Sequence, residues 1–206
     1  MVPDYIIATD GGVLLDPNKA EVPGAYAYVI LNCKTMNYII QGDALNGKTI
    51  NYAESYAIYK ALKYLRKLTK DKPTNVLVIS DSKLTVLALS IWSKENWNTS
   101  DPYNWKKSTG QKVKNQEIYR KIQKEEAEGN IFIKYAHINS HLDIDSSTDI
   151  TKIKYKVLDY GVTVSNREAR LIMLMNKWAD DKATEMRTKW LRSRRGFKVM
   201  LPKKEV

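Results

Sequence analysis

The order of its apolar segments limits the fold of this chain more than any other feature of the sequence. Short apolar runs typical of strands occur at residues 5–9, 25–31, 37–41, 75–80 and 131–137. Helical segments are predicted at residues 51–68, 82–91, 115–128 and, after a capping-box pattern, from 165 to about 190. Three successive strands followed by alternating helices and strands predict an α/β fold, in which a mixed sheet has helices on both faces.

The composition narrows the class of protein. With 206 residues, 43% of them hydrophobic, the chain can form one domain, which we expect over residues 1–190. No apolar run approaches the roughly 18 residues that a membrane span needs, and no secretory signal is visible, so we expect no membrane partner. Cys33 is the one cysteine, which excludes an intramolecular disulfide framework. We predict a cytoplasmic monomer, and the abundance of Lys, Asn and Tyr suits an AT-rich genome such as that of a bacterial virus.

The positive charge is concentrated in two segments. The net charge is +11; residues 94–124 carry eight Lys or Arg and three Asp or Glu, and residues 187–206 carry eight and one. The rest of the chain is therefore close to neutral. Such basic segments favour a polyanionic partner, because they bind phosphates by releasing counterions. For the basic tail from residue 191 onwards, a solubilising role is the alternative.

Aromatic residues are interleaved with the cations of the first basic segment. The expected nucleic-acid contacts there are Trp92, Trp97, Trp105, Lys106, Lys107, Lys112 and Lys114. Aromatic side chains among lysines suit stacking on bases or sugars together with pairing to phosphates. The alternative interpretation is that the tryptophans pack a small helical subcluster.

Four acidic residues lie where a sheet could bring them together. Asp10 and Asp81 each follow an apolar strand, and Glu54 lies in the first turn of the first long helix. Asp180 lies in the last helix, and its helical neighbours Asn176 and Ala183 suggest that it faces inward. Each acid also has an ordinary structural explanation, as a turn residue, a helix cap, a charge at a helix N-terminus or a solvated residue.

Four carboxylates at one rim would repel one another unless cations neutralise them. Magnesium prefers oxygen ligands, keeps several waters and combines one or two protein carboxylates with substrate phosphates. Two such ions about 4 Å apart can activate a water and stabilise the leaving oxygen of a phosphoryl displacement. The acids therefore predict a site for two Mg²⁺ ions with substrate, with Mn²⁺ as an alternative.

The ordered motifs resemble those of type 1 ribonucleases H. The matching stretches are YIIATDGG at residues 5–12, TINYAE at 49–54, ISDSK at 79–83, VKN at 113–115, INSH at 138–141 and NKWADDKA at 176–183. The resemblance covers nearly the whole chain. It implies a ribonuclease H-like five-stranded mixed sheet, with three antiparallel strands followed by parallel strands. It also implies cleavage of the RNA strand of RNA–DNA hybrids, which leaves 5′-phosphate and 3′-hydroxyl ends.

The resemblance also implies roles for individual residues. The four metal-binding catalytic acids correspond to Asp10, Glu54, Asp81 and Asp180, and His141 corresponds to a loop histidine that assists proton transfer or product release. The implied substrate contacts are Gly11, Gly12, Thr49, Asn51, Lys83 and a basic handle at about residues 92–114, in which Trp92 packs near the DNA strand. Three departures stand out. Ile50 replaces a usual Asn, Lys83 replaces a common Gln, and residues 142–164 form an insertion, which we interpret as a hairpin or flap.

Two other functions share these features. One is a nuclease of the same fold that acts on DNA, and the other is a non-catalytic nucleic-acid-binding module. The segment 49–51 and the handle argue against the first, since recognition of RNA needs contacts to 2′-hydroxyl groups. The presence of all four acids argues against the second.

Overall fold

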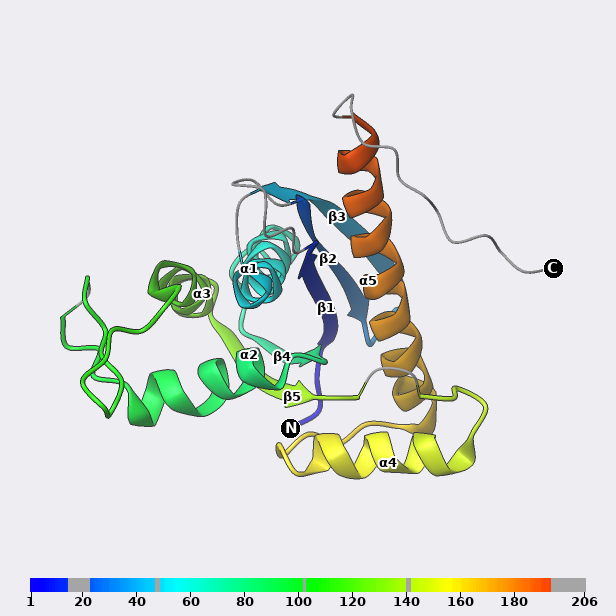
Figure 1. Cartoon of the computed structure of the whole chain (residues 1–206). Helices are drawn as coiled ribbons and strands as arrows, with labels where there is room; N and C mark the ends of the chain where they lie inside the picture. Colours follow the sequence, from blue (N-terminus) through cyan, green and yellow to red (C-terminus); the bar gives the residue numbers. More distant parts are fainter. Residues whose placement is uncertain (15–22, 47–48, 102, 140–141, 194–206) are drawn as a thin grey trace.

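The computed structural model describes residues 1–14, 23–46, 49–101, 103–139 and 142–193 (Figure 1). Five strands in this part of the chain form one sheet in the order β3-β2-β1-β4-β5. They are β1 (Tyr5–Val13), β2 (Pro23–Asn32), β3 (Tyr38–Asn46), β4 (Thr74–Ser80) and β5 (Ile131–His137). Strands β1 to β3 pair antiparallel, whereas β1, β4 and β5 pair parallel. The predicted mixed sheet is confirmed.

Helices cover both faces of this sheet. They are α1 (Ile50–Thr69), α2 (Lys83–Leu87), the π-helix η1 (Ala88–Asn96), α3 (Gln116–Glu128), α4 (Ser147–Leu158) and α5 (Asn166–Ser193). Figure 1 shows α1 and α5 on opposite sides of the sheet. Among the described helices, none is both long and apolar enough to cross a bilayer.

The central strand β1 is buried on both faces. Ile7 belongs to the core cluster that contains α1 and α3, and its neighbour Ile6 belongs to the cluster that contains α4 and α5. Successive side chains of a strand point to opposite faces, so one apolar run supplies both cores. The run 5–9 is therefore a near-continuous apolar segment instead of an alternating one.

The structure corrects the predicted end of the first strand. We expected this strand over residues 5–9 with Asp10 after its end, but β1 continues to Val13 because both following glycines pair with β2, Gly11 opposite Tyr26 and Gly12 opposite Ala25. Asp10 therefore lies inside a strand and not at its end.

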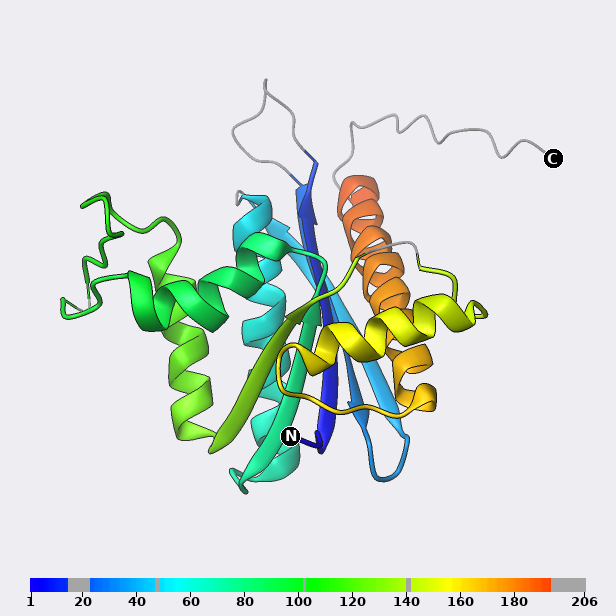
Figure 2. The same cartoon turned by 90° about the horizontal axis from the view of Figure 1, so that it is seen from below.

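The predicted hairpin or flap at residues 142–164 contains a helix instead. Ser146 caps α4 by accepting a hydrogen bond from the Asp149 N–H at 3.2 Å. Ile150, Ile153 and Val157, three and four residues apart, are buried in the α5-side core. Figure 2 shows α4 crossing the sheet beside α5. The insertion therefore completes a layer of the fold.

The handle begins with a longer helical segment than expected. The helix predicted at 82–91 is α2, which passes directly into η1 and ends at Asn96. The following residues form short β-bridges that join Lys106 to Asn98 and to Lys112. Figure 1 shows this segment projecting from the body of the protein beyond α3.

Candidate active site

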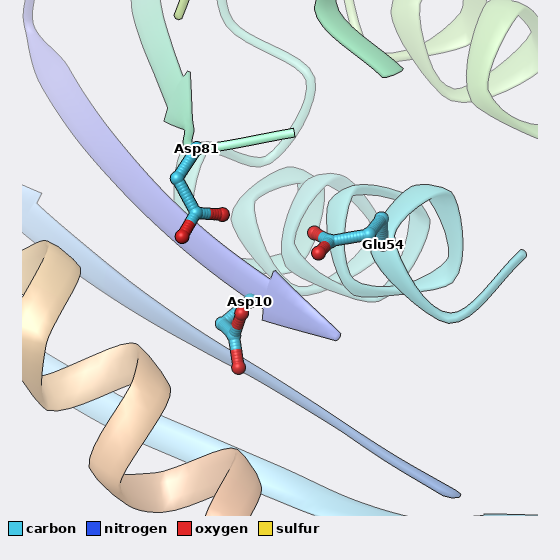
Figure 3. A group of neighbouring side chains, drawn as sticks. All are labelled: Asp10, Glu54 and Asp81. Atoms are coloured by element: carbon cyan, nitrogen blue, oxygen red, sulfur yellow. The ribbon is translucent and has the colours of Figure 1, made fainter. Parts of the chain in front are cut away.

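Three carboxyl groups from distant parts of the chain meet beside β1. Asp10 lies in β1, Glu54 in α1 and Asp81 directly after β4. One carboxylate oxygen from each residue lies within 4.8 Å of the other two. Figure 3 shows the three side chains pointing toward one another. The structure therefore brings together three of the four predicted acids.

The sheet register places Asp10 beside Asp81. Strands β1 and β4 are parallel and pair Thr9 with Ser80, so these two acids are the next residues on adjoining strands. His137, at the end of β5, has its Nε2 atom 3.1 Å from the carbonyl oxygen of Asp81. This contact ties β5 to the point where the chain leaves β4.

Gly11 allows Glu54 to reach the other two acids. A Cβ atom at Gly11 would lie 2.3 Å from the carbonyl carbon of Ala53 and 2.4 Å from the nitrogen of Glu54. Only glycine therefore lets the backbone of α1 lie directly against β1. The Gly11 N–H also hydrogen-bonds to the carboxyl groups of Asp10 and Glu54, which lowers the pKa of each.

The environment disfavours charge on these acids. Burial raises the pKa of Asp10 to about 6, and the nearby charges of Asp81 and Asp180 add to this effect. Burial likewise raises the pKa of Glu54, helped by Asp10 and Asp81. Oxygen Oε2 of Glu54 is buried and has no hydrogen-bond partner in the described part of the protein. A buried acceptor without a partner among repelling carboxylates fits a site for a hard divalent cation.

Asp180 lies at the margin of the cluster. It is exposed on α5 and is not among the three acids whose oxygens lie within 4.8 Å of one another. It lines a hollow of about 380 Å³ together with Asp81, Asn139 and Asn176. Its charge contributes to the raised pKa of Asp10. The structure therefore places Asp180 next to the three acids but outside their tight group.

The predicted substrate contacts on α1 lie beside the acids. Thr49 precedes α1 and accepts a hydrogen bond from the Tyr52 N–H at 3.2 Å. The amide Nδ2 of Asn115 donates to Oγ1 of Thr49 at 3.4 Å, which joins the end of the handle to the start of α1. Asn51, and Lys83 at the start of α2, are exposed, whereas Gly11 is buried and Gly12 half-buried. His141 lies outside the described residues.

The structure corrects the role predicted for Trp105. Its side chain is only 3% exposed and belongs to the core, so it has no surface to offer a base. The ring of Trp97 packs between those of Trp92 and Trp105, at centroid distances of 6.3 and 6.2 Å. The alternative interpretation, in which the tryptophans pack against one another, therefore holds for Trp105. Trp92 and Trp97 are half-buried. Four lysines of the handle, predicted as substrate contacts, are exposed, namely Lys106, Lys107, Lys112 and Lys114.

Arg187 is a further residue at the site, although the sequence indicated it only as part of the basic C-terminal segment. A Cβ atom at Gly12 would lie 2.4 Å from Nη1 of Arg187, so the guanidinium group rests against this glycine. Nη2 donates to Oγ1 of Thr184 at 2.9 Å, and the positive charge lowers the pKa of Asp10. The spacing could have indicated this position, because residues 180 and 187 are seven apart and therefore lie on the same face of a helix.

The raised pKa of Asp10 predicts how stability depends on pH without divalent metal. The pKa is about 6 in the folded state against an ordinary 3.8, so the folded protein binds this proton more tightly than the unfolded chain does. The contribution of Asp10 to the free energy of unfolding is therefore highest below pH 3.8 and falls by about 3 kcal/mol as the pH rises through about 6. Urea unfolding in EDTA, measured across this range for the natural chain and for Asp10→Asn, isolates this difference. Parallel curves for the two proteins would contradict it.

Comparison with known proteins agrees with this geometry. A family model described as RNase H matches residues 3–148, more than half of the chain. Two curated relatives named Ribonuclease H, from type A strains of Clostridium botulinum, are 25% identical over 154 residues. The match covers 75% of this chain and 95% of each relative. Asp10, Glu54 and Asp81 lie inside the range matched by the family model, whereas Asp180 lies beyond it.

Solved structures share the fold. LC11-RNase H1, isolated from compost by a metagenomic approach, has a TM-score of 0.55 at 22% identity, and the match covers 92% of this chain and 99% of that one. The N-terminal RNase H domain of a Mycobacterium tuberculosis protein has a TM-score of 0.56 at 18% identity, with 93% and 98% covered. RNase H1 from Halobacterium salinarum has a TM-score of 0.53 at 16% identity, and the match covers 90% of this chain and 98% of that one.

Proposed function

This chain belongs to the RNase H family and is a ribonuclease H enzyme, and from that premise we propose that it hydrolyses the RNA strand of RNA–DNA hybrids. The observation that carries the proposal is the cluster of Asp10, Glu54 and Asp81, together with the buried Oε2 of Glu54, which has no hydrogen-bond partner among the described residues. The products would carry 5′-phosphate and 3′-hydroxyl ends.

The proposed cofactor is Mg²⁺, as two ions with substrate, and Mn²⁺ would serve as an alternative. Asp10, Glu54 and Asp81 would hold the ions, and Asp180 would complete the ligand set from α5. When bound, the ions would supply an activated water and would stabilise the charge on the leaving 3′ oxygen. The Gly11 N–H holds the carboxyl groups of Asp10 and Glu54 in place. We further propose that His141 assists proton transfer or product release.

Recognition of the hybrid would rest on backbone contacts. The main chain at Gly11 and Gly12 and the exposed side chain of Asn51 lie beside the acids, where they would contact the 2′-hydroxyl groups that distinguish RNA from DNA. Thr49 and Lys83 would contact phosphates or base edges nearby, and Trp92 and Trp97 would face the DNA strand. Phosphate and sugar contacts carry no base code, so the preference for sequence should be weak.

The position of the Arg187 guanidinium group supports the proposal that a substrate phosphate binds close to the acids. It lies against Gly12 and near Asp10, and Thr184 holds its Nη2 atom. Guanidinium groups bind phosphate oxygens with two parallel hydrogen bonds. Arg187 would therefore hold the phosphate backbone beside the scissile bond.

One experiment separates this function from its alternatives. Labelled RNA–DNA hybrid, duplex RNA and duplex DNA of the same sequence are incubated with the protein in Mg²⁺ and, separately, in EDTA. We expect cutting of the RNA strand of the hybrid in Mg²⁺ alone. Cutting of DNA would favour the DNA nuclease, and binding without cutting would favour the non-catalytic module.

The handle predicts a second measurable effect. Replacing Lys106, Lys107, Lys112 and Lys114 together by glutamine should weaken hybrid binding most at low salt. If each lysine pairs with one phosphate, the slope of log affinity against log salt falls by roughly 0.9 for each lysine replaced. Fluorescence anisotropy over a salt series measures both quantities. An unchanged slope would show that the handle does not bind the backbone.

The proposed organisation is a single ribonuclease H domain over residues 1–190, followed by a basic tail. The packing of α4 and α5 on the same sheet as α1 supports this division, because both core clusters share the central strands. We also propose that the protein acts as a monomer in the cytoplasm.

A further inference from the structure

A hollow of about 570 Å³ lies at the β3 edge of the sheet, apart from the acidic cluster. It lies between α1 and the edge strand β3, and α5 contributes Lys182. Lys60, Lys63 and Lys67 of α1 line it, and Asp43 of β3 is the one acid among the described residues of its lining. We call this hollow, with its four lysines, the lysine pocket.

The described residues neutralise only part of the positive charge of the lysine pocket. Lys182 pairs with Glu185 at 2.9 Å, but no ion pair occurs for Lys60, Lys63 or Lys67 within the described ranges. The Asp43 carboxylate accepts a hydrogen bond from the adjacent Ala44 N–H at 2.7 Å.

The three lysines of α1 form a row along the helix. Their spacing of three and four residues places them on one face, where like charges repel and destabilise the helix. The ammonium groups of Lys60 and Lys63 lie over tyrosine rings, at 5.7 Å from the centre of Tyr26 and 5.9 Å from that of Tyr59. These ring contacts hold cations at the surface without neutralising them. A bound polyanion would remove the repulsion.

The lysine pocket lies in line with the acids across the sheet. Asp10 pairs with Ala27 of β2, and Ala27 pairs with Gly42 of β3. Two interstrand spacings therefore separate Asp10 from Gly42, or about 10 Å. A Cβ atom at Gly42 would lie 3.2 Å from Cγ of Lys182, so this lysine contacts the pocket lining at Gly42.

We propose that the lysine pocket binds the phosphate backbone of a nucleic-acid strand outside the catalytic centre, an inference that rests on the proposed function. From Lys60 to Lys67 the helix rises about 10 Å, which matches about three successive nucleotides at a rise of roughly 3.4 Å per strand. Cations in a row suit an extended polyanion, whereas a single phosphate would need them to converge. Lysines act as point charges on phosphate, so the contact is independent of sequence.

The test uses the triple variant Lys60→Gln, Lys63→Gln and Lys67→Gln. A matched control replaces three exposed lysines at other places, Lys34→Gln, Lys72→Gln and Lys134→Gln, and therefore has the same net charge. Binding of a hybrid of about 24 base pairs is measured in EDTA over a salt series. We expect the pocket variant to bind about tenfold more weakly at low salt, with a salt slope reduced by roughly 2 to 3, whereas the control changes less than about twofold.

Several outcomes would overturn the inference. If the pocket and control variants weaken equally, the effect is one of net charge alone. If the two variants bind the hybrid equally, and millimolar inorganic phosphate stabilises the control against thermal unfolding but not the pocket variant, the pocket binds small anions. If the pocket variant loses affinity for polyglutamate but not for the hybrid, the pocket binds an acidic protein segment.

The experiment distinguishes a failure of this inference from a failure of the proposed function. Cleavage of the same hybrid by the natural chain in Mg²⁺ is measured in parallel. If the natural chain does not cut the hybrid, the proposed function is wrong. If it cuts the hybrid and the pocket variant binds as the control does, only the inference is wrong. Thermal unfolding of both variants checks their folding, and the pocket variant should not melt below the control.

Discussion

Replacing Asp10 by asparagine is expected to abolish cleavage of the hybrid while the protein still binds it. The substitution keeps the size of the side chain but removes one carboxylate from the group that Asp10 forms with Glu54 and Asp81. The charge stabilisation that a metal ion supplies is worth several kcal/mol, so we expect a loss of about 1000-fold or more in rate. In the proposed function, binding would rest mainly on contacts of the handle with the substrate backbone, so it should change little. Single-turnover cleavage in Mg²⁺ and anisotropy in EDTA measure the two quantities.

The same variant should be more stable than the natural chain when no divalent metal is present. At neutral pH the natural Asp10 is charged although burial and the neighbouring Asp81 disfavour that charge. Asparagine removes this cost, so its free energy of unfolding in EDTA should rise by up to about 3 kcal/mol. If Asp10 only supported the fold, its replacement would lower the free energy of unfolding instead of raising it.

Asp181 provides the matched control on α5. It is exposed, pairs with Lys177 at 2.8 Å and is not part of the acidic cluster. Asp181→Asn should therefore cleave at a normal rate and unfold within about 0.5 kcal/mol of the natural chain. Near-normal turnover in Asp10→Asn would show that the site is assigned wrongly.

Replacing Gly11 by alanine is expected to produce the largest loss of stability. The added methyl group would lie 2.3–2.5 Å from backbone atoms of Ala53 and Glu54, which cannot move without shifting α1 away from β1. Overpacking of this kind typically costs about 1–3 kcal/mol, and contact with backbone atoms of two residues places this case at about 3 kcal/mol or more. Glu54 would move with α1, so stabilisation by Mg²⁺ should be lost as well. Urea unfolding with and without Mg²⁺ tests both expectations.

Gly12→Ala is the control for Gly11→Ala, because it also replaces a glycine of β1 but does not crowd the backbone of α1. Its methyl group would meet only the guanidinium end of Arg187, at 2.4 Å, and that flexible side chain can turn away. We expect this variant to lose no more than about 1 kcal/mol and to keep its stabilisation by Mg²⁺. Equal losses in the two variants would contradict the close approach of α1 to β1.

Local patterns predicted the elements whose core contacts follow a simple period. The strand at 131–137 and the strand at 75–80 agree with β5 and β4 within one residue. Both are short apolar runs bounded by polar residues, a pattern that is typical of buried strands. The helix at 147–158 was missed because its three buried residues, Ile150, Ile153 and Val157, form a short pattern within a polar segment. That pattern becomes clear only when the sheet face that it covers is known.

The amino-acid sequence by itself determined the family, the mixed sheet and the identity of the three clustered acids, because these depend on residue types in a fixed order along the chain. Only the tertiary structure decided how those acids group. The close approach at Gly11 brings Glu54 to Asp10, and the path of α5 leaves Asp180 at the margin. The burial of Trp105 and the row of lysines beside β3 also depend on which elements lie next to one another. Contacts between residues far apart in the chain have no periodic signature, and they arise only when the layers pack.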